Sequence, residues 1–489
     1  LTYELADITE DTQTLSQRQA EQRAQVDSLE RRLNLVQRQL EIGGGSVALG
    51  DVLRNQRRRL ATPSLSFLTS DTLNGLPDVS TAELDRFQLQ QTRAELDNPA
   101  MMAERIASQA DVTLNAGQRE SLINLLDQRR TIIDRLIDAE GRYVDVGRDL
   151  RSLSRHYNDT LSSFNRLLDE RLFWLPSFHG LWLDWPARLA EDVPWLLDPR
   201  SWREALAAFA GGIVAKPFRA GLAILVIGAL LGMRGLFKRR LAVLAEPVGN
   251  VSHDSVALTL RALLATLLLA LPTIMLPLSI GYLTQHAPGA TPFVKAAGSA
   301  VFQLGMLALF IEPFTQVVRA NGLAEAHFRW SDKARRNLHR DLRGLSLALV
   351  VPIIVISMTE AFDDDTKRET IGRAAFMLGE FSIAIFAWRV LHPVTGVLSD
   401  VMTDHENGNW RLGYFWLPVA TAIPLALSGM AARGYYYTAL QLQSRFFYSA
   451  ALLGGAVILY SLIVRWLTVA ERRIALSRAL KRREEAREA

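Results

Sequence analysis

The sequence predicts an all-α protein in which an N-terminal helical, coiled-coil domain is followed by a polytopic α-helical membrane domain of about seven spans. Three observations predict this fold. The chain has 489 residues, 49% apolar and 22% charged, but residues 1–203 are polar whereas residues 205–470 are dominated by long apolar runs. In the polar part, apolar residues recur at spacings of three and four, as in packed helices. The apolar runs are long enough to cross about 30 Å of hydrocarbon.

Composition excludes several classes of protein. The apolar content rules out a disordered polymer, and the chain has neither a collagen repeat nor the cysteine density of a small disulfide-stapled module. There is no cysteine at all, so disulfides, thiolate metal sites and cysteine nucleophiles are excluded. The last residues stop inside a charged helical pattern, which indicates that the polypeptide continues beyond Ala489.

Long helices are predicted in the polar part. Positions spaced by four and three over Leu1–Leu40 form one apolar seam, Gly43–Gly45 ends this helix, and a second helix is predicted over Val47–Leu60. The stretch Ala61–Val79 is predicted to be a loop. The same spacing returns over Leu122–Leu167, which predicts a rod of roughly 75 Å. Since an apolar seam cannot stay exposed, we expect the two long helices to pack on each other or on neighbouring subunits, as a scaffold rather than a ligand-binding domain.

Between Leu172 and Phe209 the composition changes to tryptophan and proline. Indole rings favour the headgroup layer of a membrane, because the ring is apolar while its N–H stays hydrated. We therefore expect a collar at the membrane surface, and a tryptophan-rich hinge between domains is the alternative. The candidate interfacial anchors are Trp174, Trp182, Trp185, Trp195 and Trp202.

Seven apolar stretches are long enough to span a bilayer. They are Ala220–Phe237, Val256–Leu283, Phe293–Val318, Leu342–Phe362, Ile371–Leu398, Leu412–Ala432 and Phe446–Val469. The predicted domains are a periplasmic long-helix domain (1–171), a Trp-rich interfacial linker (172–217), a transmembrane domain (218–470) and a cytoplasmic basic helix (471–489) that leads into a missing C-terminal region.

Lysine and arginine follow the first, third and seventh stretches, whereas the alternate connections have little net positive charge. Cytoplasmic loops carry the excess of these residues, so the N-terminal domain is predicted to be periplasmic and the tail cytoplasmic. The connection Ser399–Trp410 has no lysine or arginine and is neutral on this point. The candidates for contact with lipid headgroups are Arg234, Arg239, Arg240, Arg335 and Arg336.

Ionisable side chains inside the spans are costly, and so invite a functional interpretation. Arg261 and Glu312 lie at similar depths in the second and third stretches and are predicted to pair. Glu380 lies deeper in the fifth stretch, with Lys295 as its candidate partner. A proton or ion relay is one interpretation. Adhesion between helices is the simpler one, because these residues do not form a spaced chain of Asp, Glu and His.

Sequence signals for an enzyme are absent. The eight histidines form no HExxH motif and no close pair, and there is no GxxxxGK[ST], GxGxxG or GxSxG motif. We therefore expect no catalysis, no cofactor and no metal site. Asp363–Asp365 could bind a divalent cation, but a solvated turn is the simpler interpretation. The basic connection Arg329–Arg343 is expected to meet anionic lipid and not nucleic acid.

Three segments together carry a resemblance. The heptad helix leads into VALGDVLRNQRRRL (Val47–Leu60), the rod ends in LDERLFWLPS (Leu168–Ser177), and the spans lead into a basic helical tail. In these features the chain resembles the large multi-span members of the small-conductance mechanosensitive channel (MscS) superfamily, of the MscK/MscM kind. The resemblance covers nearly the whole chain. It corresponds to the family's periplasmic and inner-membrane part, without the C-terminal pore and vestibule.

The resemblance implies a homo-oligomer, a heptamer, in the bacterial inner (cytoplasmic) membrane. Such an assembly opens an ion-permeable pore when tension rises during hypoosmotic shock, so membrane lipids, further copies and permeant ions would be its partners. The family's pore helix follows a region like this one, so no pore residue can be transferred to this chain. Two alternatives stay open: a secondary transporter, which needs an internal repeat that we do not recognise here, and a non-conducting envelope scaffold.

Overall fold

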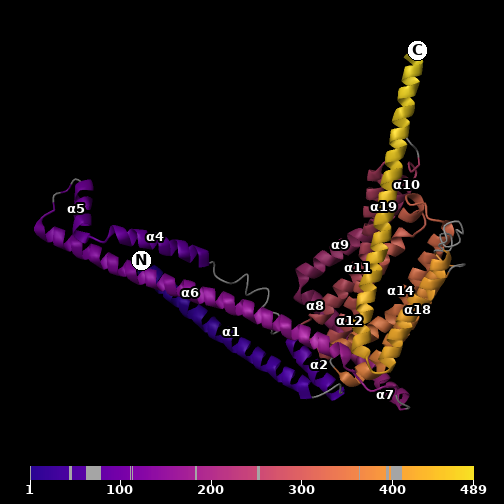
Figure 1. Ribbon diagram of the computed structural model, residues 1–489, viewed down its shortest axis with the longest axis horizontal. Coiled ribbons are helices and arrows are strands. Elements are labelled where there is room, and N and C mark those ends of the chain that lie inside the picture. Colours follow the sequence, from indigo (N-terminus) through magenta and orange to yellow (C-terminus); the bar gives the residue numbers. More distant parts are fainter. Residues whose placement is uncertain are drawn as a thin grey trace. The chain divides into compact units, whose positions relative to one another are not determined.

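A computed structural model describes residues 2–42, 47–61, 79–110, 112, 114–181, 184–249, 254–362, 364–392, 396–397 and 410–488. Every regular element in these ranges is a helix, which confirms the all-α prediction. The chain divides into two compact units, Leu1–Leu175 and Pro176–Ala489 (Figure 1).

The described part of the first unit is dominated by two very long helices. Its helices are α1 (Thr2–Ile42), α2 (Val47–Ala61), α4 (Val79–Glu95), α5 (Pro99–Gln109) and α6 (Ala116–Trp174). The longest, α6, has 59 residues, which corresponds to about 90 Å. It begins with a capping box, in which the Asn115 side chain accepts a hydrogen bond from the Gln118 N–H (2.9 Å) and the Gln118 side chain accepts one from the Asn115 N–H (3.1 Å).

The two heptad helices pack on each other, as predicted. α1 lies against α6, and the seam of α1 is buried at Leu15, Val26 and Val36. Polar contacts flank this seam: His156 Nε2 lies 2.8 Å from Glu30 Oε1. The predicted glycine stop at Gly43–Gly45 and most of the predicted loop Ala61–Val79 lie outside the described residues.

The second unit holds the apolar helices. In chain order they are α7 (Trp185–Leu197), α8 (Pro199–Ala215), α9 (Pro217–Gly232), α10 (Arg234–Ala245), α11 (Val256–Gln285), α12 (Pro292–Val317), α13 (Leu323–Ala326), α14 (Asp332–Phe362), α15 (Asp365–Lys367), the π-helical turn η1 (Arg368–Gly372), α16 (Arg373–Leu391), α18 (Trp410–Ala432) and α19 (Tyr436–Glu488).

Six of the described helices are long and apolar enough to cross a membrane, and the number rises to seven if one bent pair counts as a span. The exception is the first predicted span, Ala220–Phe237, which is not one helix. α9 ends at Gly232 and α10 starts at Arg234, and the 16 residues of α9 cover only about 24 Å. α9 meets the preceding α7–α8 segment at 102°, at Pro217, where proline fixes the first turn of a new helix.

Two predicted boundaries also move. α16 ends at Leu391 and not at Leu398, because the residue before Pro393 is disfavoured in the helical conformation. The last span and the basic tail form one helix, since α19 runs unbroken over 53 residues. Figure 1 shows α19, in yellow, extending past the other helices of its unit to the C-terminus.

The spans pack in chain order: α11 on α12, α12 on α14, α14 on α16, and α16 on α18. The bundle therefore has two ends. We call the end where α12 stops and α14 starts, around residues 319–343, the basic end. The opposite end, where α12 starts and α14 stops, is the aromatic end; α8 packs there on α11 and α12, and α7 packs on η1.

Candidate functional site

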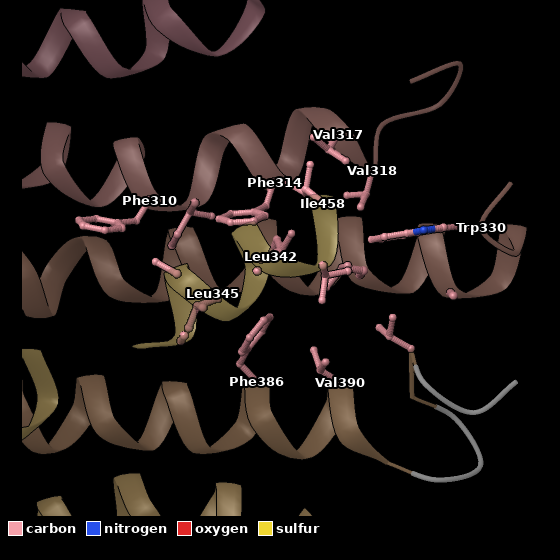
Figure 2. Close-up of a pocket in the computed structure, with 18 of the residues that line it drawn as sticks. Phe310, Phe314, Val317, Val318, Trp330, Leu342, Leu345, Phe386, Val390 and Ile458 are labelled. Carbon is pink, nitrogen blue, oxygen red and sulfur yellow. The ribbon is translucent and has the colours of Figure 1, made fainter. Parts of the chain in front are cut away.

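An apolar pocket of about 630 Å³ lies among four spans of the second unit. Figure 2 shows side chains from α12, α14, α16 and α19 converging on it. Its lining comprises Phe310, Ile311, Phe314, Val317, Val318, Trp330, Ser331, Ala334, Leu338, Leu342, Leu345, Phe386, Val390, Val397, Phe447, Ala450, Ala451, Gly454, Val457, Ile458, Tyr460 and Ser461.

The chemistry of this pocket suits a hydrocarbon chain. Its volume falls in the range of about 300–1,000 Å³ that is common for ligand sites, but its polar groups are limited to an indole, a phenol and hydroxyls. Gly454 brings α19 close to α12, because a Cβ built there would lie 2.7 Å from two carbons of the Phe314 ring. The next residue, Gly455, faces open space. The pocket thus lies between α19 and the bundle, within the apolar belt.

A buried ion pair lies on α19 one helical turn beyond the pocket residue Ser461. Arg465 binds the carboxylate of Asp254, which lies two residues before the start of α11, and the two residues are 5% and 4% exposed. The Gly249 N–H donates a 3.0 Å hydrogen bond to the same carboxylate. Arg473 donates to the Asp254 carbonyl oxygen at 3.3 Å. This Asp254 cluster fixes α19 to the base of α11.

Burial and charge act in opposite directions on Asp254. Burial raises the pKa of this carboxyl, but the hydrogen bonds from Arg465 and Gly249 and the charges of Arg465 and Arg472 outweigh it and hold the pKa below its usual range. Beside it, His327 is 3% exposed, and its Nδ1 lies 3.1 Å from the Thr259 hydroxyl. Burial, aided by the charge of Arg465, lowers the pKa of His327 to about 4. The cluster therefore combines a charged pair with a neutral imidazole at pH 7.

The aromatic end holds a second fastening, centred on Arg373. This side chain is fully buried, and its guanidinium donates hydrogen bonds to the carbonyl oxygens of Ala431 (2.6 Å), Ala432 (2.6 Å) and His179 (3.0 Å). The first two are carbonyls at the C-terminus of α18, where a cation is favourable. Arg373 thus joins the start of α16 to the end of α18 and to the segment before α7.

That segment, Ser177–Leu181, is bound along the turn between α18 and α19, and we call it the strap. The N–H groups of Ser177 and Phe178 donate to the Gly434 carbonyl oxygen at 2.8 and 3.1 Å. Gly434 has φ +103°, and a Cβ there would collide with the Phe178 carbonyl, so only glycine fits. The strap starts two residues after the first unit ends at Leu175, so the chain enters the second unit directly at the α18–α19 turn.

The predicted tryptophan anchors differ in their surroundings. Trp174 is 74% exposed, and Trp182 lies outside the described residues. Trp185 donates its indole N–H to the Glu369 carbonyl at 3.1 Å. Trp195 and Trp202 both pack edge-on against Phe293 with ring centroids 5.6 Å away. These last two rings lie inside the second unit, so their main contacts are with protein.

Positive charge accumulates at the basic end. Three effects lower the pKa of Lys238: the charge of Arg319, which is the largest, then burial, and then the charge of Arg234. The Arg234 Nε is buried without a hydrogen-bond partner in the described part of the chain, whereas Arg239 and Arg240 are exposed. Like charges held together in this way favour an anion between or beside them.

The other two headgroup candidates differ from each other. Arg335 is 7% exposed and is held by Glu325 at 3.3 Å and Asp332 at 3.2 Å. It is therefore an internal ion-pair residue, which leaves little of it to reach a headgroup. Arg336 has a side chain that is 66% exposed, 3.7 Å from Asp332, so it is free to extend outwards.

The structure does not bring the predicted intramembrane pairs together. Arg261 is exposed, and Glu312 accepts a hydrogen bond from Gln316 at 2.6 Å. Lys295 is exposed, whereas Glu380 is 1% exposed and has a carboxylate oxygen without a partner among the described residues. The Glu312–Gln316 contact lies within α12, so it does not join two helices as the adhesion interpretation requires.

Arg373, Arg465 and Arg389 make buried contacts in the structure, and sequence analysis did not select them. All three lie inside predicted spans, so the criterion that selected Glu380 would have selected them too. Arg389 pairs with the buried Asp341 of α14 at 2.8 Å. Their partners could not be found in the same way, because Asp254 and Arg465 are 211 positions apart.

Comparison with known proteins agrees with this architecture. Residues 217–489 match the family described as "Mechanosensitive ion channel inner membrane domain 1". The chain is 26% identical over 454 residues to "Mechanosensitive channel MscK" of Escherichia coli, covering 92% of this chain and 39% of that protein. It is 27% identical over 465 residues to "Miniconductance mechanosensitive channel MscM" of Escherichia coli, covering 93% and 40%.

A third relative is an "Uncharacterized MscS family protein" of Haemophilus influenzae, 22% identical over 496 residues, covering 98% of this chain and 42% of the relative. The chain therefore spans about two fifths of the length of the curated relatives it matches. The channel names belong to two of these relatives, and none of the three is named as an enzyme. The chain belongs to the MscS family of mechanosensitive channels, as a member similar to MscK and MscM.

Proposed function

We propose that this chain is part of a subunit of a tension-gated ion channel of the bacterial inner membrane, which releases ions and osmolytes on hypoosmotic shock. The subunit self-associates, as a heptamer, around a pore encoded after residue 489. The chain supplies the periplasmic helices and the lipid-facing helices around that pore. The proposal includes no catalytic step and no cofactor.

The observation that carries this proposal is the pocket between α19 and the other spans. Lipid tails are as apolar as its lining, so nothing but packing opposes their entering or leaving it. Bilayer tension favours whichever conformation occupies more area, and it shifts a population only through such a difference between states. A pocket beside α19 that holds lipid tails in one state and loses them in the other gives two conformations that differ in how α19 packs. Because α19 continues to the C-terminal end of the chain, a movement of α19 would be passed directly to the pore region proposed to follow it.

Prolines inside the spans support this mechanism. They interrupt the backbone hydrogen bonds of a helix and allow it to bend. Those inside the described helices are Pro272, Pro277, Pro313, Pro352, Pro418 and Pro424. Bends at these positions give the bundle room to rearrange around lipid without breaking a helix.

The proposed topology places residues 1–171 in the periplasm and 172–217 at the periplasmic surface of the inner membrane, with Trp174 in the headgroup layer. Residues 218–470 lie in the membrane and 471–489 in the cytoplasm. The bias of lysine and arginine towards the basic end supports it. The turn at Asp364–Thr370 and the start of α14 lie at opposite ends of that helix. A membrane-impermeant thiol reagent should label Thr366→Cys from outside intact cells and Lys333→Cys only after permeabilisation. Labelling of both from one side would contradict the topology.

We further propose that Arg234, Arg239, Arg240 and Arg336 contact lipid headgroups. Each basic residue near an anionic surface contributes about 1 kcal/mol to the attraction. Replacing Arg239 and Arg240 together by glutamine should therefore change the tension threshold in excised patches. Removal of two arginines from the first unit, at positions 129 and 155, is the matched control for loss of charge. An unchanged threshold in the first variant would count against the headgroup role.

The full-length protein tests the proposed function directly. It should be expressed in spheroplasts that lack other mechanosensitive channels and recorded under graded suction. We expect single-channel steps whose open probability rises with suction. Suction-independent transport of a solute would support the transporter, and the absence of any conductance would support the scaffold.

A further inference from the structure

Helix α19 is attached to its own unit at the two ends of its apolar part, Tyr436–Val469, more than along that part. Within its most apolar window no residue is buried inside the chain. At the aromatic end the α18–α19 turn is held by Arg373 and the strap. At the other end Arg465 and Val469 are buried, and the Asp254 cluster is the polar contact there. Between these two fastenings lies the pocket.

The Asp254 cluster has the features of a specific contact. The carboxylate receives Arg465 and the Gly249 N–H, and Arg472 lies 3.8 Å away. A buried pair of this kind adds little net stability compared with apolar residues of the same size, because both ions lose their hydration. Its effect is on geometry: if one partner moves away, the other is left as an uncompensated buried charge. The pair is therefore favourable in one register of α19 against α11 and unfavourable in neighbouring registers.

The position of the pair adds a second argument. Arg465 is four residues after the pocket residue Ser461, so the two side chains lie on the same face of α19. A rigid displacement of α19 that widens or closes the pocket therefore also moves Arg465 relative to Asp254. Asp254 belongs to the connection between α10 and α11, and α10 carries the exposed arginines of the basic end. The pair thus joins the connection after α10, whose arginines are proposed to contact lipid headgroups, to α19.

We propose that the Asp254–Arg465 pair is a latch that positions α19 against the base of α11 in the resting protein and opens when the bilayer is stretched. The inference rests on the proposed function for its gating part, whereas the positioning part stands on the structure alone. Asp254 and Arg465 are positioning residues, because neither is placed in a pore. Loss of either residue should release α19 from the start of α11 and lower the membrane tension needed to open the channel.

The experiment uses the full-length protein, and the 489 residues of this chain contain no cysteine. Spin labels at Leu260→Cys on α11 and Leu467→Cys on α19, which are 54% and 49% exposed at the native leucines, report the distance across the latch in liposomes. Asp254→Asn and Arg465→Gln should each lengthen and broaden this distance, and each should lower the threshold in patches. The charge-exchanged pair, Asp254→Arg with Arg465→Asp, should restore both only in part, because Arg472, 3.8 Å from the native carboxylate, opposes a cation at position 254.

Matched variants separate a latch from a general loss of stability. Arg188→Gln breaks an exposed ion pair of the same type, with side chains 46% and 58% exposed, and should change neither readout. If Asp254→Asn does not fold, Asp254→Glu and Arg465→Lys keep both charges while altering reach, and the distance should shift less than in the neutral variants that do fold.

Each outcome decides between the two proposals. An unchanged label distance in the folded single variants overturns the latch. A changed distance with an unchanged threshold, in a protein that conducts, overturns its gating part. If the native protein does not conduct under tension, the proposed function fails, and the distance alone then decides whether the pair positions α19.

Discussion

Replacing Gly454 by leucine should close the apolar pocket from the α19 side. A Cβ at this position would lie 2.7 Å from two carbons of the Phe314 ring, whereas carbon atoms in contact are about 3.5–4.0 Å apart. Even alanine therefore requires the ring or α19 to move by about 1 Å, and leucine adds three more carbons. Phe314 and Gly454 both line the 630 Å³ pocket, so the new side chain and the displaced ring should take up space proposed for lipid.

Gly455 provides the matched control, because a Cβ there meets no atom within 4 Å. Both substitutions raise helix propensity by a similar amount, about 0.8–1 kcal/mol, so that contribution cancels in the comparison. Any difference between Gly454→Leu and Gly455→Leu is then due to the pocket.

Contact with lipid tails can be measured by quenching. A fluorophore on Ser461→Cys, a pocket-lining position, should be quenched when the protein is reconstituted in phospholipid with brominated acyl chains. We expect Gly454→Leu to lose most of this quenching and Gly455→Leu to retain it. Equal quenching in the two variants would refute the assignment of the pocket to lipid tails.

Three further predictions concern the fastenings. Arg373→Lys keeps the charge but replaces the planar guanidinium, whose three nitrogens each reach a carbonyl, by one ammonium nitrogen that cannot match all three positions. At about 1.5–3 kcal/mol for each hydrogen bond lost, this should lower the melting temperature in detergent, whereas Arg188→Lys should not. The pKa of His327 is about 4 in the folded protein and 6.5 in the unfolded chain. As the pH falls, the unfolded chain therefore binds the proton first, and the free energy of unfolding should fall by up to about 3 kcal/mol between pH 6.5 and pH 4. His327→Gln should reduce this dependence of stability on pH. Trp195→Leu loses ring contacts with two phenylalanines, each contributing about 0.5–1.5 kcal/mol, and should destabilise the protein more than Trp174→Leu; an equal effect would contradict the packed role of Trp195.

Patterns local in sequence predicted the helices well. The heptad spacing over Leu1–Leu40 and Leu122–Leu167 corresponds to α1 and α6, because a seam with that period has to face a partner helix. Hydropathy found the six long spans, because a span needs little beyond length and apolar character. It did not find the break within Ala220–Phe237, where the apolar run is continuous but Gly232-Met233 divides it into α9 and α10.

The site was less accessible from the sequence. The pocket depends on how side chains from four helices fill space, and a single glycine, Gly454, decides how closely α19 approaches. Depth in a span suggested that Arg261 should meet Glu312, but depth does not give rotation about the helix axis, and Arg261 faces outwards. Similarly, an interfacial composition does not distinguish the exposed Trp174 from Trp195, whose ring packs on Phe362.

The central claim, that α19 moves relative to the bundle when the membrane is stretched, can be tested by one distance. Spin labels at Leu347→Cys on α14 and Leu459→Cys on α19, where the native leucines are 77% and 59% exposed, report the separation of the two helices that border the pocket. The full-length protein in liposomes should show a changed, broader distribution after hypoosmotic swelling than under isotonic conditions. A distribution that stays the same in swollen liposomes through which the protein demonstrably conducts would contradict the account.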